Sequence, residues 1–171
     1  AMALGCDVIT EKPMTINEKK CRRILDTQKQ TGRNVRVTFN YRYSPPRTQI
    51  KDMLMSGLIG EILSVDFHWM LDRKHGADYY RRWRRRKENS GGLMVHKATH
   101  HFDLVNWWLS SVPQRVFASG HRRFYTPETA DRYGLESRGS WCGECPSSCK
   151  CPLYMDLGQW RRGLYEECVQ Y

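Results

Sequence analysis

The first part of the chain alternates between two kinds of hydrophobic pattern. Residues 6–10 and 35–39 are short segments that predict strands. Between them, Asn17 precedes a segment, 18–31, whose apolar residues recur at helical spacing, and Gly32 follows it as a helix stop. We therefore predict a strand, a helix and a parallel strand, which form a βαβ unit. The helix is expected to face inward through Cys21, Ile24 and Leu25.

The middle of the chain predicts a different mixture of elements. Ser44 can cap a helix that runs to about Ser56, since Pro45 suits the first helical position. Residues 61–70 and 113–120 alternate in the manner of strands, whereas the polar, arginine-rich stretch 75–89 predicts a loop with helical turns.

The stretch 91–109 predicts one helix opened by a glycine turn. Part of its surface is apolar, but a second stripe carries groups that can titrate or bind ligands. Such groups are costly to bury without partners, so the stripe is better explained as the lining of a cleft than as a set of structural histidines. A metal site is the less favoured alternative, because a lysine stands inside the histidine pair. The stripe consists of His96, His100, Asp103 and Trp107, and Lys97 and His101 flank it.

The net charge of +10 over 171 residues favours an anionic ligand, partner or neighbouring domain. The basic run 81–86 could contact nucleic acid, but a charge run without a reading fold is weak evidence, so we expect no nucleic acid partner. We explain this run as a loop that closes over a cofactor pyrophosphate or an acidic sugar. The chain has no apolar run long enough for a membrane span and no signal peptide. We therefore expect a cytoplasmic protein without membrane contact, unless a longer parent carries an upstream export signal.

Four of the seven cysteines gather in the segment 141–152 with the spacing C-x2-C-x3-C-x-C. Four thiolates can form a structural zinc site, which is the prediction we favour. Two local disulfides or free thiols are the alternatives. The odd total is compatible with a reducing compartment. The predicted metal ligands are Cys142, Cys145, Cys149 and Cys151.

The tripeptide Glu11-Lys12-Pro13 follows the first predicted strand directly. The carboxyl ends of parallel strands are where open α/β sheets bind ligands. A lysine held at that edge can donate a hydrogen bond to a substrate oxygen or stabilise negative charge as it develops.

Several motifs occur in a characteristic order: T-E-K-P at 10–13, F-N-Y-R-Y-S-P at 39–45, G-L-I-G at 57–60, and two glycines at 91–92 followed by His100 and Asp103. Over residues 1 to about 125 this order resembles the Gfo/Idh/MocA oxidoreductases, the relatives of glucose–fructose oxidoreductase and inositol dehydrogenase. The resemblance implies an α/β fold. Residues 1–41 would form the end of a Rossmann NAD(P)-binding domain, and 42–171 an incomplete α+β substrate domain with an open sheet. The full-length protein would form a homo-oligomer through that sheet.

The resemblance also implies roles for individual residues. Lys12 and His100 would be catalytic, together with His96, which stands where the family has an aspartate. The residues implied in binding NAD or NADP are Glu11, Lys12, Pro13, Arg42 and Trp83, and those implied in binding substrate are Lys97, His101, Asp103 and Tyr79.

The implied activity is NAD(P)-dependent oxidation of a sugar or cyclic polyol. An NAD-dependent glycosidase of the same family and a non-catalytic sugar-binding or partner-binding module are the alternatives. The sequence contains no G-x-G-x-x-G turn, which the family uses to hold the cofactor phosphates. We therefore expect the chain to be a fragment that is inactive by itself.

Overall fold

The computed structural model describes residues 1–156, and residues 157–171 lie outside the described part. The chain divides into two compact units. The first unit comprises residues 1–68 and 90–116, and the second comprises 69–89 together with 117 onward. The predicted domain boundary after residue 41 stays a prediction.

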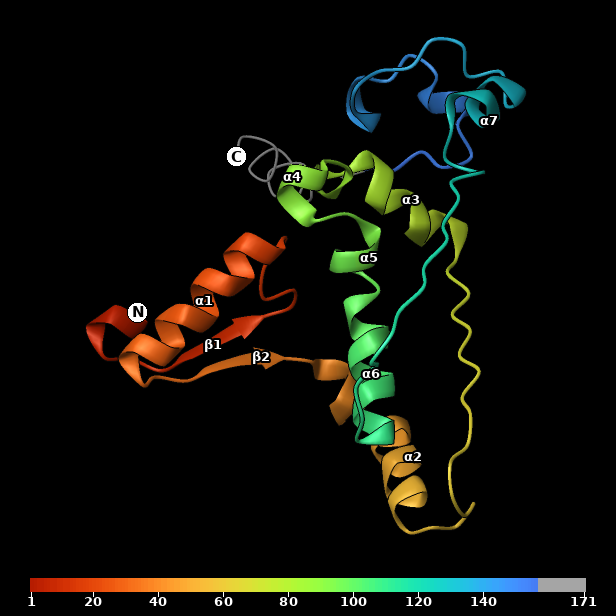
Figure 1. Cartoon of the computed structure of the whole chain (residues 1–171). Coiled ribbons are helices and arrows are strands. Elements are labelled where there is room, and N and C mark those ends of the chain that lie inside the picture. Colours follow the sequence, from red (N-terminus) through yellow and green to blue (C-terminus); the bar gives the residue numbers. More distant parts are fainter. Residues whose placement is uncertain (157–171) are drawn as a thin grey trace. The chain divides into compact units, whose positions relative to one another are not determined.

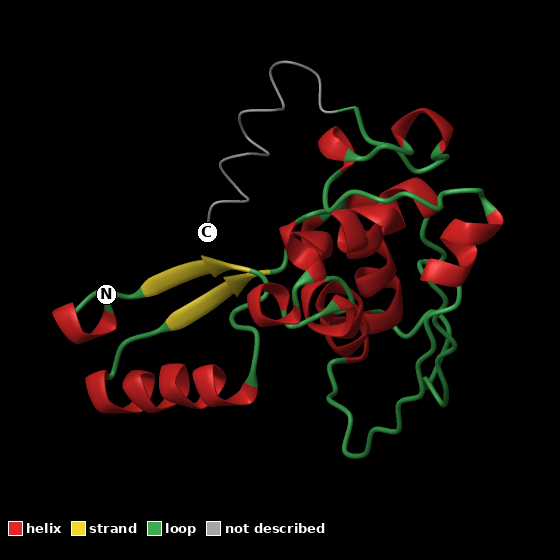
Figure 2. Cartoon of the chain, turned by 90° about the horizontal axis from the view of Figure 1, so that it is seen from above, coloured by secondary structure: helices red, strands yellow, loops and turns green. Residues whose placement is uncertain are grey.

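The first unit begins with the predicted βαβ arrangement (Figures 1 and 2). Strand β1 (Val8–Glu11) pairs in parallel with β2 (Val35–Thr38), in a register that places Val8 opposite Val35. Helix α1 (Glu18–Thr31) connects them and runs along one side of the strand pair, as Figure 2 shows. The α/β fold class is therefore confirmed.

Local capping explains why α1 has the predicted bounds. The side chain of Asn17 accepts a hydrogen bond from the Lys20 N–H at 3.0 Å, and Gly32 closes the helix at a φ of 64°. A short 3₁₀ turn, η1 (Met2–Leu4), precedes β1. The predicted inward position of Leu25 is wrong, because this side chain is 46% exposed. A two-stranded sheet is too narrow to cover the whole apolar side of the helix.

The 3₁₀ turn η2 (Asn40–Tyr43) and helix α2 (Pro45–Met55) follow β2. Helix α2 contacts the later helix α6 (Thr99–Leu109) through side chains that reach backbone oxygens. The Lys51 amine donates to the Trp107 carbonyl at 2.7 Å, and the Trp108 indole N–H donates to the Arg47 carbonyl at 2.9 Å. These bonds fix α6 against the elements that continue from the sheet.

The predicted single helix over 91–109 is wrong, since the structure divides it into α5 (Leu93–His96) and α6. Gly91 opens the region at a φ of 71°, where an added Cβ would lie 2.8 Å from the Ile16 carbonyl oxygen. The break follows from shared hydrogen bonds: the N–H groups of Lys97 and Ala98 both donate to the Leu93 carbonyl, at 2.9 and 3.1 Å. The regular helical ladder is therefore interrupted immediately before His100.

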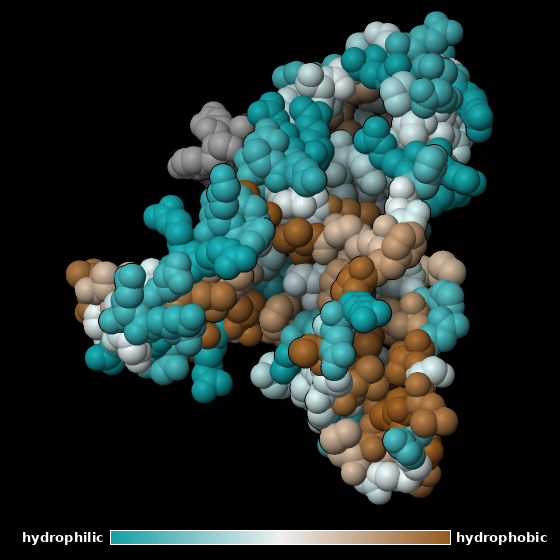
Figure 3. Space-filling view, in the orientation of Figure 1, coloured by the Kyte–Doolittle hydropathy of each residue, from teal (hydrophilic) through white to brown (hydrophobic). Residues whose placement is uncertain are grey.

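The predicted strands over 61–70 and 113–120 are also wrong, because β1 and β2 are the only strands among the described residues. Most of their apolar side chains remain exposed; Met70 is 88% exposed and Phe117 is 94% exposed. An extended segment becomes a strand only when a neighbouring strand accepts and donates its backbone hydrogen bonds. Figure 3 shows apolar surface over α2 and the segment that follows it. The predicted homo-oligomer through an open sheet stays a prediction.

The second unit contains α3 (Arg73–Arg81), the 3₁₀ turn η3 (Trp83–Arg85), and α7 (Pro127–Arg132). Helix α4 (Lys87–Ser90) follows η3, and the cysteine-rich segment forms two further 3₁₀ turns, η4 (Cys142–Glu144) and η5 (Ser148–Lys150). The predicted loop over 75–89 is thus largely helical. Helix α3 begins directly after Asp72, whose carboxylate accepts hydrogen bonds from the N–H groups of Lys74 and His75. No helix in the described residues combines the length and apolar character that a membrane crossing requires.

Candidate functional site

Lys12 lies at the carboxyl end of β1, on the edge where parallel sheets bind ligands. Its ammonium group donates a hydrogen bond to the His96 carbonyl oxygen at 3.1 Å. The preceding Glu11 is tied down locally, since its carboxylate accepts from the Lys12 N–H and from the Thr38 hydroxyl, each at 3.1 Å. The peptide bond between Lys12 and Pro13 is cis. Lys12 therefore joins the sheet edge to the segment that precedes α6.

His100, in the first turn of α6, is the most buried of the predicted catalytic residues, with 5% of its surface exposed. Its imidazole stacks on the Tyr41 ring at 4.1 Å between centroids and 9° between planes. Phe39 contacts it edge-on at 6.3 Å. The Nδ1 atom of His100 is buried and has no hydrogen-bond partner among the described residues. A buried imidazole with an unsatisfied nitrogen is unusual in a purely structural position.

The electrostatic surroundings keep His100 neutral. Burial, followed by the positive charges of Lys12 and Lys97, lowers the pKa of His100 from its ordinary 6.5 to about 4. Two smaller contributions oppose each other: His101 lowers this pKa further, and Glu11 raises it. At neutral pH the ring is thus an unprotonated imidazole, the form that can accept a proton.

Lys97 and His101 flank this imidazole, as the sequence predicted. The Lys97 ammonium donates to the Tyr41 hydroxyl oxygen at 3.2 Å. The His101 ring lies 5.7 Å from Phe67 and 6.1 Å from Tyr41, and burial followed by the charge of Lys97 lowers its pKa. Both residues therefore belong to the same cluster as His100, and their roles in substrate binding stay predictions.

Asp103 and Arg42 bind each other. Arg42 Nε donates to Asp103 Oδ2 at 2.7 Å, and Arg42 Nη2 donates to the second carboxylate oxygen. Phe39 and Trp107 each hold a ring 5.8 Å from the Arg42 guanidinium. The hydrogen bond that Arg42 donates to Asp103 raises the pKa of Arg42. This bidentate pair fixes α6 against η2, three residues beyond His100.

His96 enters the site through its backbone carbonyl, which is the acceptor for Lys12. It ends α5, whereas His100 lies in α6, so the two histidines do not lie on one continuous helix. Tyr79 and Trp83 belong to the second unit, where the Arg84 guanidinium lies 5.4 Å from the Tyr79 ring and 5.9 Å from the Trp83 ring.

The four clustered cysteines are free cysteines around η4 and η5. Cys145 accepts a hydrogen bond from the Gly139 N–H at 3.5 Å. Within residues 1–156, no three histidine, cysteine or acidic side chains are arranged to hold a metal ion. The structure therefore does not bring the four thiols together as a ligand set, and structural zinc stays a prediction.

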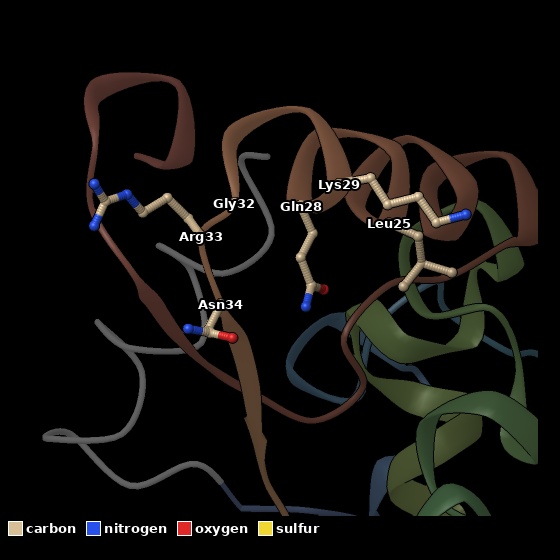
Figure 4. A pocket seen from close by; sticks show the side chains of 6 residues that line it. All are labelled: Leu25, Gln28, Lys29, Gly32, Arg33 and Asn34. Atoms are coloured by element: carbon tan, nitrogen blue, oxygen red, sulfur yellow. The ribbon is translucent and has the colours of Figure 1, made fainter.

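A cavity of about 390 Å³ opens at the other end of the βαβ unit (Figure 4). It is lined by Leu25 and Gln28 of α1 and by the residues that lead into β2, including Asn34. The amide groups of Gln28 and Asn34 point into the same open space. This is the amino end of the strands, away from the edge where such sheets bind ligands. We therefore place the candidate site at Lys12 and His100.

Sequence reasoning missed Tyr41, although it contacts both His100 and Lys97. Its position was informative, because it comes shortly after β2 and therefore lies near the same carboxyl edge as Lys12. The assembled cluster places a lysine ammonium and a neutral, buried imidazole near one edge of the sheet. Such a pair can bind a hydroxyl oxygen and remove its proton.

The chain is similar in sequence to several known oxidoreductases. YteT of Bacillus subtilis (strain 168) is 47% identical over 148 residues, which cover 86% of this chain and 35% of that protein. An inositol 2-dehydrogenase/D-chiro-inositol 3-dehydrogenase of Lactiplantibacillus plantarum is 30% identical over 108 residues, 63% of this chain and 28% of that enzyme. The D-glucoside 3-dehydrogenase of Escherichia coli (strain K12) is 22% identical over 135 residues, 78% of this chain and 38% of that enzyme.

The chain thus spans between 28% and 38% of the length of these relatives. Residues 51–171 match the family model described as the oxidoreductase family, C-terminal alpha/beta domain. This match covers more than half of the chain and confirms the resemblance seen in the ordered motifs. The chain belongs to the Gfo/Idh/MocA oxidoreductase family.

Proposed function

We propose that this chain supplies the proton-handling groups for an NAD(P)-dependent oxidation of a sugar or cyclic polyol. One observation carries the proposal: Lys12, at the carboxyl edge of the sheet, reaches the backbone four residues before a buried imidazole whose Nδ1 has no partner. A positioned amine and a neutral imidazole are the groups that this reaction needs at the substrate hydroxyl.

Each of the two residues has a distinct task. Lys12 donates a hydrogen bond to the substrate oxygen and stabilises the negative charge that develops there. His100 accepts the hydroxyl proton, because burial and the neighbouring lysines keep its ring neutral. The same positive charges disfavour the imidazolium that results, so His100 does not retain the proton.

The cofactor fits this edge of the sheet. NAD(P)⁺, when bound, supplies the hydride acceptor. The residues at the carboxyl edge are suited to its nicotinamide end, where Lys12 provides a donor and the orphaned Nδ1 of His100 a buried polar group. The glycine loop for the phosphates is not found in this sequence. Binding of the whole dinucleotide is therefore assigned to the full-length protein.

The substrate class rests on relatives named for inositol and for D-glucosides. Both are polyhydroxylated rings, in which one secondary hydroxyl can be oxidised while the others are available for hydrogen bonds. His101 and Lys97, which lie beside His100, are the side chains that we assign to these other hydroxyls.

The test is a turnover assay on the full-length protein that carries this sequence. NAD⁺ or NADP⁺ is supplied with a panel of cyclic polyols, aldoses and alkyl glycosides, and the reduced nicotinamide is followed by its absorbance. We expect reduction with at least one ring polyol or sugar. Sugar binding without turnover would contradict the proposal in favour of a binding module. NAD⁺-dependent glycoside cleavage without net reduction would favour the glycosidase.

A further inference from the structure

The Tyr41 ring stacks on the ring of His100. The two rings are nearly parallel, 9° apart, with centroids separated by 4.1 Å. Tyr41 lies on η2, immediately beyond β2, whereas His100 lies on α6, so this stack connects two elements that are distant in sequence. Neither element alone would fix the plane of the imidazole.

The Tyr41 ring is itself held by two cations. The Arg47 guanidinium lies 4.2 Å from the ring centroid, and the Lys97 ammonium donates to the hydroxyl oxygen at 3.2 Å. Arg47 belongs to α2, and Lys97 lies between α5 and α6. Tyr41 is therefore anchored both by α2 and by the segment between α5 and α6.

We propose that Tyr41 is a positioning residue that fixes the ring plane of His100 through the stack of the two rings. This proposal rests on the proposed function, because it assigns His100 as the base. A base histidine is usually oriented by a hydrogen bond from its second ring nitrogen to a carboxylate or carbonyl. The Nδ1 of His100 has no such partner among the described residues. Ring stacking supplies the orientation in its place.

Tyr41 also shields a crowded electrostatic site. His100 is faced by Lys12 and Glu11 from the end of β1, and by Lys97 and His101 from its own segment. Arg47 approaches from α2, and the Arg42–Asp103 pair lies one helical turn away. Removal of the Tyr41 ring would admit water among these groups. Both the orientation of the imidazole and its pKa would then change. If Tyr41 contributed only to stability, its removal would leave both unchanged.

The experiment compares Tyr41→Phe, Tyr41→Leu and the control Tyr43→Leu. Tyr43 lies on the same 3₁₀ turn but is 78% exposed and outside the cluster. Each variant is measured in two ways: by the NMR shifts and pH titration of the His100 ring protons, and by kcat and KM of the full-length protein. Tyr41→Met replaces Tyr41→Leu if the latter does not fold.

We expect Tyr41→Leu to abolish the upfield ring-current shift of the His100 protons, to raise the pKa of His100, and to lower kcat about tenfold with little change in KM. Tyr41→Phe retains the ring, so it should keep the shift and most of kcat. Tyr43→Leu should match the parent protein in both measurements.

Two results would overturn the proposal. One is a Tyr41→Leu protein in which the His100 shifts and kcat are unchanged. The other is a Tyr41→Phe protein as impaired as Tyr41→Leu, which would assign the effect to the hydroxyl rather than to the stack. Because the NMR shifts require no turnover, they test Tyr41 even if the full-length protein oxidises no polyol. Failure of this inference and failure of the proposed function can thus be told apart.

Discussion

The two ends of the short β1–β2 sheet differ in burial more than in composition. At the carboxyl end, Lys12 reaches the His96 carbonyl and lies near the buried, stacked ring of His100. At the amino end, Leu25, Gln28 and Lys29 line an open cavity of about 390 Å³. Both ends carry a lysine. What distinguishes them is that the carboxyl end brings distant segments of the chain together around a buried ionisable side chain, that of His100.

The comparison shows that a basic residue near a cavity is weak evidence of function. Lys29 is an exposed residue in the last turn of α1, a position that suits the helix dipole without any ligand. Lys12 instead bonds to a carbonyl 84 residues away in the sequence and lowers the pKa of a buried histidine. Substitutions at the two ends should therefore have very different consequences.

The largest expected effect is on turnover. In the full-length protein, His100→Ala or Lys12→Met should lower kcat/KM by about two to four orders of magnitude, the usual contribution of a positioned proton-transfer group. Lys29→Met and His68→Ala are matched controls, because both residues are exposed and lie outside the cluster. Steady-state kinetics of the variants and controls would test this prediction, with cofactor binding measured separately. Full activity in His100→Ala would contradict the assignment of His100 as the base.

The second effect is a dependence of stability on pH. The folded pKa of His100, about 4, lies below its ordinary 6.5, so between these pH values the unfolded state binds a proton that the folded state does not. Stability should therefore fall as the pH is lowered from 6.5 towards 4, by about 3 kcal/mol from this residue. Urea unfolding measured at several pH values in this range should show that the free energy of unfolding depends less steeply on pH in His100→Gln than in the parent protein. An equal pH dependence in the two proteins would contradict the assignment.

The third effect tests the ion pair that fixes α6. The Asp103 side chain is 9% exposed, so removal of Arg42 leaves a carboxylate largely out of water. We expect Arg42→Met to destabilise the protein by about 2 kcal/mol, less than for a fully buried pair because Arg42 is partly exposed. Glu18→Gln, which breaks the exposed pair with Arg22, should cost only about 0.3 kcal/mol. Equal losses in the two variants would show that the Asp103 pair contributes no more than a surface contact.

The smallest effect concerns the cap of α1. Asn17→Ala removes the side-chain acceptor for the Lys20 N–H and should lower stability by about 1 kcal/mol. Asn17→Asp, which keeps the acceptor, is the matched control and should lose little. The free energy of unfolding of the two variants would test whether the start of the helix depends on this single hydrogen bond.

Features set by local sequence were predictable. Asn17 and Gly32 determine the ends of α1 through bonds within a few residues, and the prediction of that helix agrees with the structure. The resemblance to a known family also implied that Lys12 and His100 share one site, and helical spacing placed Lys97 and His101 beside His100; all three lie near His100 in the structure. Chain order and capping chemistry carry this information without any knowledge of long-range contacts.

Features that depend on distant partners were not predictable. Residues 61–70 have the alternation of a strand, but strand formation depends on a neighbour that the pattern does not specify. The break before α6 depends on Lys97 and Ala98 sharing one carbonyl, and periodicity alone does not reveal it. Likewise, the stacking of Tyr41 on His100 joins residues 59 positions apart, so no local pattern in the sequence indicates it.

The central claim is that the Lys12 ammonium and the His100 imidazole share one site. The most direct measurement is the NMR titration of His100 in the parent protein, in Lys12→Met and in Lys20→Met, an exposed lysine of α1. We predict that Lys12→Met raises the pKa of His100 towards its ordinary value, because a neighbouring positive charge is removed, and that Lys20→Met leaves it unchanged. An identical His100 titration in all three proteins would contradict the claim.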